Sequence, residues 1–404
     1  MYPFKVFHKK GFYTGEDGQS RLYICTLFRI SLIKNNISFM RFHRLASVYL
    51  LCSASALYAQ FQPNTANQLL QASGTLSIRG YGECIGNQPL AGQGTWDARR
   101  FVLFTGYKYD ANTAVVTEIE VEHATEIYLE QAFFQHRLRP GVNLRAGLML
   151  IPMGIANEYH EPTTFHGAER PYLDQVVVPS TWRELAAGFQ GFVPRRTLGY
   201  QLYVVNGLRS FDGQKALFTG DKGLRGGRQK GRQTLAAHPG VIGKLEWGGL
   251  KNTLVSASYY AGQTESPVEG SKPGLLDSTT VFLQMSSVDL RWAVQRFQFR
   301  AQGTLAHLGG AEAYRLRTGS NIATWIGGAY AEGAVQVLPA RSPYACWAFS
   351  RYSVVQTDAE PVQLWTQGLS FFINSGVVLK LDAQQRRTPS EVAWTVNSGF
   401  GFWF

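Results

Sequence analysis

Short segments in which apolar residues alternate with polar or small ones follow one another along most of this chain. Clear examples are GTLSIRGYGE (74–83), RFVLFTGYKY (100–109) and TEIYLEQAFFQH (125–136). Successive side chains of a strand point to opposite faces, so each segment predicts a strand with one apolar and one polar face. Sixteen segments fit the pattern: residues 74–83, 100–109, 114–122, 125–136, 142–150, 184–192, 199–207, 241–247, 251–261, 278–294, 297–307, 324–337, 344–356, 361–374, 376–386 and 393–404. An even number of such strands predicts an all-β fold over residues 74–404, a closed antiparallel transmembrane β-barrel of about 16 strands.

The connections between these segments alternate between long and short. The long ones are residues 84–98, 152–182, 208–240, 262–277 and 308–323, and the short ones include 110–113, 139–141, 194–197, 248–250 and 374–376. Outer-membrane barrels have this asymmetry, with short periplasmic turns and longer extracellular loops, whereas a soluble β-sandwich has no reason for it. The link at residues 123–125 is an exception, because it is short where a loop is expected.

The composition agrees with a barrel and argues against a helical membrane protein and a nucleic-acid-binding protein. Charged residues are only 17% of the chain, below the roughly 25% usual for soluble domains. Beyond the N-terminal region the sequence has no run of about 20 apolar residues, which excludes a helical membrane protein. The formal charge of +11 arises largely before residue 60, where eight Lys or Arg face two acidic residues. No basic helix or RNA-binding signature accompanies the remaining charge, so nucleic acid is not an expected partner.

The N-terminal region predicts export. Residues 40–59 begin at Met40 with basic residues, continue with a short apolar core and end in small residues, which is the layout of a secretory signal peptide. Cleavage is expected first after Ala59 and second after Ala56. Cys52 is not preceded by small residues, so a lipoprotein anchor is not expected. We therefore expect the protein in the cell outer membrane.

Two further segments flank this signal peptide. Residues 1–39 do not belong in front of it, and the simplest account is a spurious upstream extension, the alternative being a genuine, longer leader. Residues 60–73 are predicted to be a short periplasmic N-terminal segment, which is too short and too polar to fill a barrel.

The chain ends in SGFGFWF, with Phe400, Phe402 and Phe404 on one face of the last strand. The closing strand must pair with the first strand to remove the edges of the barrel. Its outer face meets lipid, and an aromatic residue at the rim suits the membrane interface. A terminal Phe after alternating aromatic residues also resembles the sorting signal that the barrel-assembly machinery reads. These three residues are therefore the predicted assembly signal.

Two blocks carry a resemblance: GLSFFINSGVVLKLDAQ (368–384), which is one hairpin, and residues 128–184, which are one strand pair followed by a long connection. They resemble the penultimate hairpin and the long third loop of outer-membrane porins of the phosphate-selective (O and P type) family. The resemblance implies a sixteen-stranded barrel, a homotrimer, and passive diffusion of small hydrophilic solutes or ions. It does not extend to the ladder of loop arginines and pore lysines of true phosphate channels.

Strand parity assigns the charged residues of the strands to the barrel interior. Ile119 and Val121 of one segment and Leu129 and Phe133 of the next are expected to face lipid. A charge facing lipid near the midplane costs roughly 2–4 kcal/mol, so polarity and parity should agree. The predicted pore-lining residues are Arg79, Arg100, Lys108, Glu118, Glu120, Glu122, Glu126, Glu130, Arg145, Lys244, Arg291, Arg300 and Lys380. Either they line a wet pore, or they merely solvate the wall and pair with one another.

Residues 152–182 are the predicted constriction loop. Four prolines prevent a long helix or a central strand there, and a connection of this length is usually functional or disordered. Its charged residues are Glu158, His160, Glu161, His166, Glu169, Arg170 and Asp174. The alternative is a loop folded outward over the surface. The spacing of these residues matches no zinc pattern, so neither a metal site nor a cofactor is expected.

The tract KGLRGGRQKGR (222–232) is basic and rich in glycine. On an extracellular loop it would contact anionic lipopolysaccharide or draw anions to the mouth of the barrel. The alternative is a flexible, solvated loop.

Three classes of function are open to such a barrel. The first is a passive porin, surrounded by outer-membrane lipid and lipopolysaccharide. The second is a barrel enzyme of the phospholipase type, which would need a lipid-facing Ser–His pair, with only His136 and His307 as candidates. The third is a transporter of hydrophobic substrates, which would need an apolar plug. The sequence contains no recognised catalytic motif, so no catalytic residues and no enzyme activity are expected.

Two cysteines, Cys84 and Cys346, follow the predicted signal peptide. The predicted topology puts Cys84 at the outer end of the first strand and Cys346 at the periplasmic start of the thirteenth. A bilayer core is about 30 Å thick, whereas bridged Cα atoms lie at most about 7 Å apart, so two free thiols are expected. Only Cys84 would then react with a membrane-impermeant maleimide added to intact cells.

Overall fold

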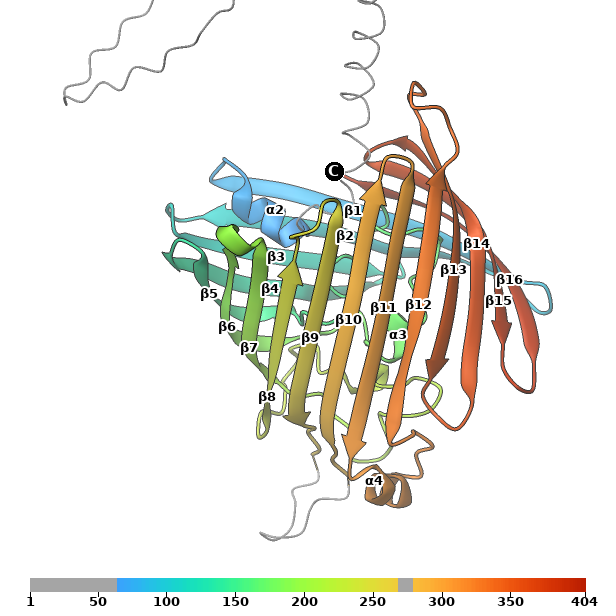
Figure 1. Cartoon of the computed structure of the whole chain (residues 1–404). Helices are drawn as coiled ribbons and strands as arrows, with labels where there is room; N and C mark the ends of the chain where they lie inside the picture. The colour runs from blue at the N-terminus through green and yellow to red at the C-terminus, as the bar shows by residue number, and fades with distance from the viewer. Residues whose placement is uncertain (1–63, 268–278) are drawn as a thin grey trace, which may run out of the picture. The chain divides into compact units, whose positions relative to one another are not determined.

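The computed structural model describes residues 64–267 and 279–404. In this part of the chain sixteen antiparallel strands form one closed barrel (Figure 1), in which β1 pairs with β16 and every other pair joins neighbours in sequence. The predicted all-β barrel and its sixteen strands are confirmed. The predicted signal peptide, residues 40–59, and the extension before it lie outside the described residues. No described helix is long and apolar enough to cross a membrane.

The strands and helices have the following bounds. The strands are β1 Leu76–Pro89, β2 Thr95–Lys108, β3 Thr113–Glu122, β4 Glu126–Arg139, β5 Val142–Leu150, β6 Arg183–Val193, β7 Leu198–Asn206, β8 Pro239–Trp247, β9 Thr253–Gln263, β10 Phe282–Val294, β11 Phe297–Gly309, β12 Trp325–Gln336, β13 Ala345–Gln356, β14 Pro361–Asn374, β15 Val377–Arg387 and β16 Val392–Trp403. The described helices are α2 Thr65–Gln71, α3 Leu173–Val176 and α4 Ala311–Thr318, with 3-10 turns at Pro194–Arg196 and Arg225–Gly227.

The first two strands are longer than the sequence pattern predicts. Only residues 90–94 lie between them, so the predicted long connection at residues 84–98 is wrong. Residues 85–89 contain Gly, Asn and Pro, which favour a turn, but here they pair with residues 395–399 of β16. Pairing with a neighbouring strand thus overrides the local preference, as is common in sheets.

The other long connections lie at one end of the barrel. Residues 151–182, 207–238 and 310–324 leave the end at which α4 lies, whereas the C-terminus lies at the opposite end (Figure 1). The links at the C-terminal end are short, for example residues 109–112. This is the asymmetry of outer-membrane barrels, in which the short turns are periplasmic. The predicted exception is also confirmed: residues 123–125 form a short link between β3 and β4 at the end of the barrel that carries the long connections.

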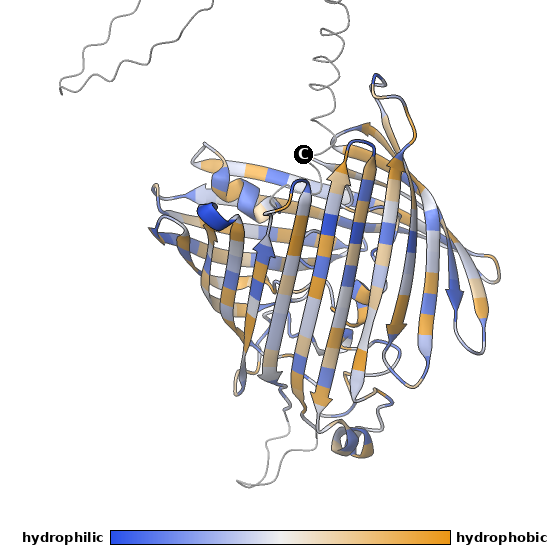
Figure 2. Ribbon diagram, in the orientation of Figure 1, coloured by the Kyte–Doolittle hydropathy of each residue, from blue (hydrophilic) through white to orange (hydrophobic). Residues whose placement is uncertain are grey.

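The two faces of the barrel wall differ in polarity. Figure 2 shows hydrophobic and hydrophilic residues alternating along the strands. Large apolar side chains such as Leu202, Val288 and Leu381 are exposed on the outer face. Charged side chains such as Glu120 and Lys244 are buried inside. The wall therefore offers an apolar surface to lipid and a polar one to the interior.

One assignment by parity is wrong. Phe133 is buried inside the barrel with the Arg145 guanidinium 4.4 Å from its ring centroid, and Phe134 is exposed in its place. The cause is a β-bulge in β4, where Glu118 pairs with Gln131 and Glu130 is the extra residue. One extra residue reverses the alternation of the strand beyond it.

The C-terminal residue completes the barrel seam. The amide of Phe404 donates to the Gly80 carbonyl oxygen at 2.9 Å, and the amide of Gly80 donates to the Phe404 carbonyl oxygen at 3.0 Å. The rings of Phe402 and Phe404 stack with their centroids 6.4 Å apart. The last aromatic residue is thus part of the ring of strands and not a loose end.

Deleting Phe404, or replacing it with Ser, is expected to lower the amount of folded barrel in the outer membrane. Both variants lose the terminal ring of the predicted sorting signal, and the deletion also loses the two hydrogen bonds to Gly80. The heat-modifiable band of outer-membrane fractions on gels measures the folded amount. Replacing Phe189, a lipid-facing aromatic residue of β6, with Ser is the control. Wild-type amounts of both Phe404 variants would contradict the sorting role.

Cys84 and Cys346 are free thiols, but the predicted position of Cys84 is wrong. Because β1 continues to Pro89, Cys84 lies within the strand, directly opposite the exposed Phe400 of β16. Directly paired residues share a face, so the thiol faces lipid and the expected reaction with an impermeant maleimide loses its basis. Strands β14, β15 and β16 lie between the two thiols in the ring. Neighbouring strands lie about 4.8 Å apart, so β1 and β13 are separated by ~19 Å along the barrel wall, too far for a disulfide between the two thiols.

Candidate functional site: a loop folded into the barrel

Residues 151–182, which connect β5 to β6, lie inside the barrel. A loop on the outer surface would expose its polar side chains, but Asn157, His160 and Asp174 are at most 2% exposed. The short helix α3 contacts β12 and β13, on the opposite side from the strands that the loop connects. We call this segment the lumen loop. The alternative of a loop folded outward is thereby ruled out.

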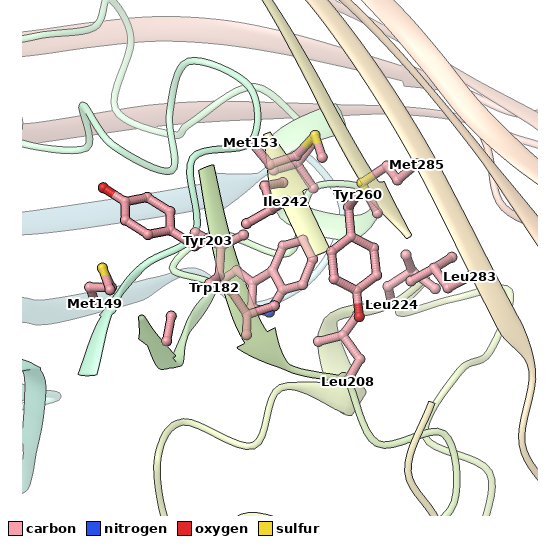
Figure 3. Close-up of a cluster of buried hydrophobic side chains, with 14 of the residues drawn as sticks. Met149, Met153, Trp182, Tyr203, Leu208, Leu224, Ile242, Tyr260, Leu283 and Met285 are labelled. Carbon is pink, nitrogen blue, oxygen red and sulfur yellow. The ribbon is translucent and has the colours of Figure 1, made fainter. Parts of the chain in front are cut away.

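The lumen loop returns to the wall at the fully buried Trp182. Its indole meets the Tyr260 ring edge-on, with centroids 5.1 Å apart. The same apolar cluster, shown in Figure 3, includes Met153, Leu208, Leu224, Ile242, Leu283 and Met285. Asn157 joins the two ends of the loop, since its amide donates to the carbonyl oxygens of Ile151 and Trp182 and its side-chain oxygen accepts the Trp182 amide.

One side of the lumen loop is held by β8 and β11. The Glu158 carboxylate forms an ion pair with Lys244 of β8. Gln302 of β11 accepts the Ile155 amide at 2.8 Å and donates to the Asp174 carboxylate at 2.8 Å. Residues predicted separately for the wall and for the loop therefore meet at this point.

The tip of the lumen loop reaches β13 and β15. Arg351 donates to the carbonyl oxygens of His166 at 3.3 Å and Glu169 at 3.0 Å. The amide of Ala168 donates to the Asp382 carboxylate at 2.7 Å. With the contacts to β8 and β11, these bonds show that the loop crosses the lumen.

At β16 the lumen loop lies against the backbone. A Cβ atom on Gly401 would overlap the ring of Pro162 in the loop. Glycine at this position of the wall is therefore required by the close approach of the loop.

The N-terminal helix also packs on the inner wall. α2 contacts β1, β2 and β3, and its Leu69 is 1% exposed against Gly106. The Thr65 hydroxyl donates to the Glu161 carboxylate of the lumen loop. Residues 60–73 are predicted to be a periplasmic segment. The structure describes this segment from Asn64 onwards, and most of that part is α2. α2 lies at the same end of the barrel as the C-terminus (Figure 1).

The predicted pore-lining residues fall into two groups. Those buried inside the barrel are Arg100, Glu118, Glu120, Glu130, Arg145, Lys244, Arg291, Arg300 and Lys380. The others are less enclosed: Arg79, Lys108 and Glu122 are half-buried, and Glu126 is exposed.

Several of these charges pair within the wall. Arg100 lies 2.8 Å from Glu83 and 3.3 Å from Glu120. Arg300 lies 2.9 Å from Glu332, which Arg351 also approaches to 3.1 Å. In each such pair the positive charge of the arginine offsets the negative charge of the glutamate. Fewer wall charges are therefore left unpaired to attract or repel ions in the lumen.

A polar cavity of about 130 Å³ lies between the lumen loop and the β1–β2 wall. The charged residues that line it are Arg99, Arg100, Arg170, Arg225, Glu83 and Glu169. Arg170 and Arg225 donate to the backbone carbonyl oxygens of His160 and Ser180 and have no carboxylate partner among the described residues. The lining itself holds four arginines and two glutamates. Two more carboxylates lie just outside it, with Glu120 3.3 Å from Arg100 and Asp97 3.2 Å from Arg99.

Burial changes the protonation of two residues of the lumen loop. Burial raises the pKa of the Asp174 carboxyl to about 7, although the hydrogen bond from Gln302 opposes the shift. Burial lowers the pKa of the His166 imidazole to about 4, so this side chain is neutral at pH 7. The charged side chains of the lumen loop that line the cavity are Arg170 and Glu169.

Sequence reasoning missed Arg99 and Arg351, and it considered Arg225 only as part of the basic tract 222–232. Strict alternation would turn either Arg99 or Arg100 towards lipid, but an irregularity in the β1–β2 pairing lets both reach inner partners. Arg225 lies in an irregular connection to which parity does not apply. Arg351 could have been found, because Tyr352 and Val354 of its strand are exposed on the outer face.

The basic tract 222–232 packs on the lumen loop. Leu224 is fully buried, and its amide donates to the Val176 carbonyl oxygen at 2.9 Å. Arg228 donates to the Thr181 carbonyl oxygen at 3.2 Å. The tract is therefore held against the loop and does not form a flexible, solvated excursion.

One group of described residues has a geometry that could hold a metal ion. Glu118 of β3, Glu130 of β4 and His160 of the lumen loop bring one potential ligand atom each within 4.8 Å of one another. All three side chains are at most 2% exposed. The group exists only because the lumen loop lies inside the barrel.

Comparison with known proteins gives a distant relative and a shared fold. No family model matches the chain. A protein of Aquifex aeolicus (strain VF5), itself described as uncharacterized, is 30% identical over 289 residues, which are 69% of this chain and 63% of that relative. The chain therefore matches less than two thirds of that relative's length.

Solved structures with a similar fold are outer-membrane proteins. The channel DcaP of Acinetobacter baumannii has a TM-score of 0.53 and 11% identity over 81% of this chain and 97% of its own. The anion-selective porin of Comamonas acidovorans has a TM-score of 0.52 and 10% identity over 81% of this chain and 99% of its own. OmpT of Vibrio cholerae, in its trimer form, has a TM-score of 0.52 and 11% identity over 82% of this chain and 100% of its own. The chain has the barrel fold of outer-membrane porins.

Proposed function

We propose that this protein is an outer-membrane porin through which small hydrophilic solutes and ions, anions in preference, diffuse passively. The observation that carries the proposal is the lumen loop, which crosses the barrel beside a polar cavity whose lining includes four arginines. A sixteen-stranded barrel is wide enough to enclose an aqueous channel. In this proposal the lumen loop is the constriction, and the charged residues of the inner wall line the water-filled lumen.

The anion preference follows from the charges that remain unpaired. Arg170 and Arg225 donate from their guanidinium groups to backbone carbonyl oxygens, and neither forms an ion pair with a carboxylate among the described residues. Walls of low dielectric constant concentrate such a field, and rings of one charge sign select ions of the other. The shared fold with an anion-selective porin is consistent with this preference.

A potassium chloride gradient across a planar bilayer tests the proposal. The wild-type protein is expected to give a reversal potential of the sign that indicates chloride preference. Replacing Arg170 and Arg225 together with Gln should move that potential towards the cation-selective side, because two uncompensated positive charges are lost. Arg387→Gln, at the exposed outer end of β15, is the matched control and should change little. Absence of channel current would contradict the porin, and an unchanged potential in the double variant would contradict the role of the arginines.

The expected partners follow from the same proposal. The apolar outer face suits outer-membrane lipid and lipopolysaccharide, and Phe400, Phe402 and Phe404 would be read by the barrel-assembly machinery. We further propose a homotrimer. The resemblance to porins of the phosphate-selective family implies this assembly, and the trimer form of the structurally similar OmpT is consistent with it. Chemical crosslinking of intact outer membranes would detect it.

No described contact favours the enzyme alternative. His136 has its Nδ1 atom 2.9 Å from the Thr113 hydroxyl, and the His307 ring packs on Trp325 at 4.4 Å between centroids. Among the described residues neither histidine is paired with a serine. α2 has seven residues, four of them Thr, Asn or Gln, so it is too short and too polar to be the apolar plug that a transporter of hydrophobic substrates needs.

A further inference from the structure

We propose that Glu118, Glu130 and His160 bind one divalent transition-metal ion, with Zn²⁺ as the probe, and that this ion fastens the lumen loop to the barrel wall. The sequence predicts no metal site, because its ligand spacing matches no known pattern and the three residues are far apart in the chain. The inference does not depend on what passes through the barrel.

Three buried atoms face one another without partners. The Nε2 atom of His160 lies 3.7 Å from Oε1 of Glu118 and 3.9 Å from Oε2 of Glu130. None of the three atoms makes a hydrogen bond in the described structure, and each is shielded from solvent. The separations are too long for hydrogen bonds. Two ligands at about 2.1 Å from a tetrahedral ion lie ~3.4 Å apart, so small shifts would admit the ion.

The imidazole is oriented as in metal sites. The Nδ1 atom of His160 lies 3.3 Å from the carbonyl oxygen of Asn157, which can only accept, so Nδ1 carries the proton. The Nε2 lone pair then points to the two carboxylates. A backbone carbonyl oxygen on the second ring nitrogen is one of the usual outer-shell partners of a metal-bound histidine. Asn157 is itself fixed by its bonds to Trp182.

The surrounding wall leaves negative charge uncompensated. Arg183 approaches Glu130 at 3.5 Å, on the oxygen that faces away from the histidine. Glu118 accepts from the Gln131 amide but has no Lys or Arg partner among the described residues. Arg100 is engaged by two other carboxylates. A buried, unpaired carboxylate is costly, and a cation or a shared proton relieves that cost.

The donor set indicates the class of ion. Imidazole nitrogen favours Zn²⁺, Fe²⁺, Ni²⁺ and Cu²⁺, whereas Mg²⁺ and Ca²⁺ prefer sites built from oxygen alone. Two carboxylates and one imidazole leave at least one position for water on a four-coordinate ion. The ligands come from β3, β4 and the lumen loop, so the bound ion would tie the loop to two strands of the wall.

Calorimetric titration with ZnCl₂ tests the proposal on untagged protein purified from outer membranes and stripped with chelator. We expect one ion per chain. Glu118→Gln and Glu130→Gln keep the shape of the side chain but remove its charge, and each should weaken binding by roughly 100-fold or more, beyond the 10–100-fold typical of an outer-shell loss. His166→Gln is the matched control, since His166 lies in the same loop but outside the group, and it should bind as the wild type does.

Two further readouts separate metal binding from a structural effect of the substitutions. Each variant is first shown to be heat-modifiable, and hence folded. Zn²⁺ should then raise the thermal unfolding temperature of the wild type and of His166→Gln but not of Glu118→Gln, because only bound ligand stabilises the native state. If the carboxylates share a proton instead, the wild type will neither bind nor be stabilised, and the proposal is overturned. Equal binding by the wild type and Glu118→Gln would also overturn it. Channel recordings play no part in either test, so the porin proposal is judged separately.

Discussion

Replacing residues 158–174 of the lumen loop with a short Gly-Ser linker is expected to raise single-channel conductance several-fold. The loop crosses the lumen from Lys244 on one side to Asp382 on the other, so its removal opens the space between them. Ion discrimination should fall at the same time, because water and salt screen the wall charges in a wider path. Both quantities are measured in planar bilayers at a fixed salt concentration.

A deletion at the other end of the barrel provides the control. Residues 339–343 lie in the exposed link between β12 and β13, and shortening them should leave conductance unchanged. The loop deletion removes partners from Lys244 and Arg351, but water can replace them in the opened lumen, so the barrel should remain heat-modifiable. An unchanged conductance in a folded loop deletion would show that ions do not pass beside the loop.

Replacing Trp182 with Ala is expected to lower the free energy of unfolding by about 3–5 kcal/mol, the usual range for removing a large aromatic side chain from a core. Trp182 is fully buried and packs on Tyr260 at the point where the lumen loop rejoins the wall (Figure 3). Urea titration of the barrel in lipid vesicles measures the change. The loop should also lose its anchor, which would appear as noisier open-channel current.

Trp96→Ala is the appropriate comparison. Trp96 is 81% exposed at the start of β2, and replacing it should change the stability by only about 0.5 kcal/mol, as is typical of exposed sites. Similar losses in the two variants would mean that the cluster around Trp182 does not stabilise the barrel.

The barrel wall could be predicted from the sequence because its physics is local. Apolar and polar residues alternate wherever a strand has lipid on one face and water or protein on the other. The alternation fails where pairing departs from regularity. The bulge at Glu130 turned Phe133 inward, and the pairing of residues 85–89 with β16 converted an apparent loop into strand. Neither departure leaves a signature in a single segment.

The candidate site could be predicted only in part. The charges of residues 152–182 were found from composition, but their partners lie on strands far away in the sequence, such as Lys244 and Arg351. The grouping of Glu118, Glu130 and His160 depends on a bulge and on an inward loop together. Spacing along the chain carries no information about either.

The crossing of the lumen by one loop has a consequence for the order of folding. Apart from the seam between β1 and β16, every strand pair of the wall joins neighbours in sequence, so the wall can form hairpin by hairpin. The lumen loop, by contrast, makes contacts between residues that are distant in sequence. Glu158 and Lys244 are separated by 86 positions, His166 and Ser370 by 204, and Ala168 and Asp382 by 214. Contacts of high sequence separation form late, because the entropy of closing a long loop must be paid first. We therefore expect the barrel to form first as a wide ring and to narrow only when the lumen loop docks on the finished wall.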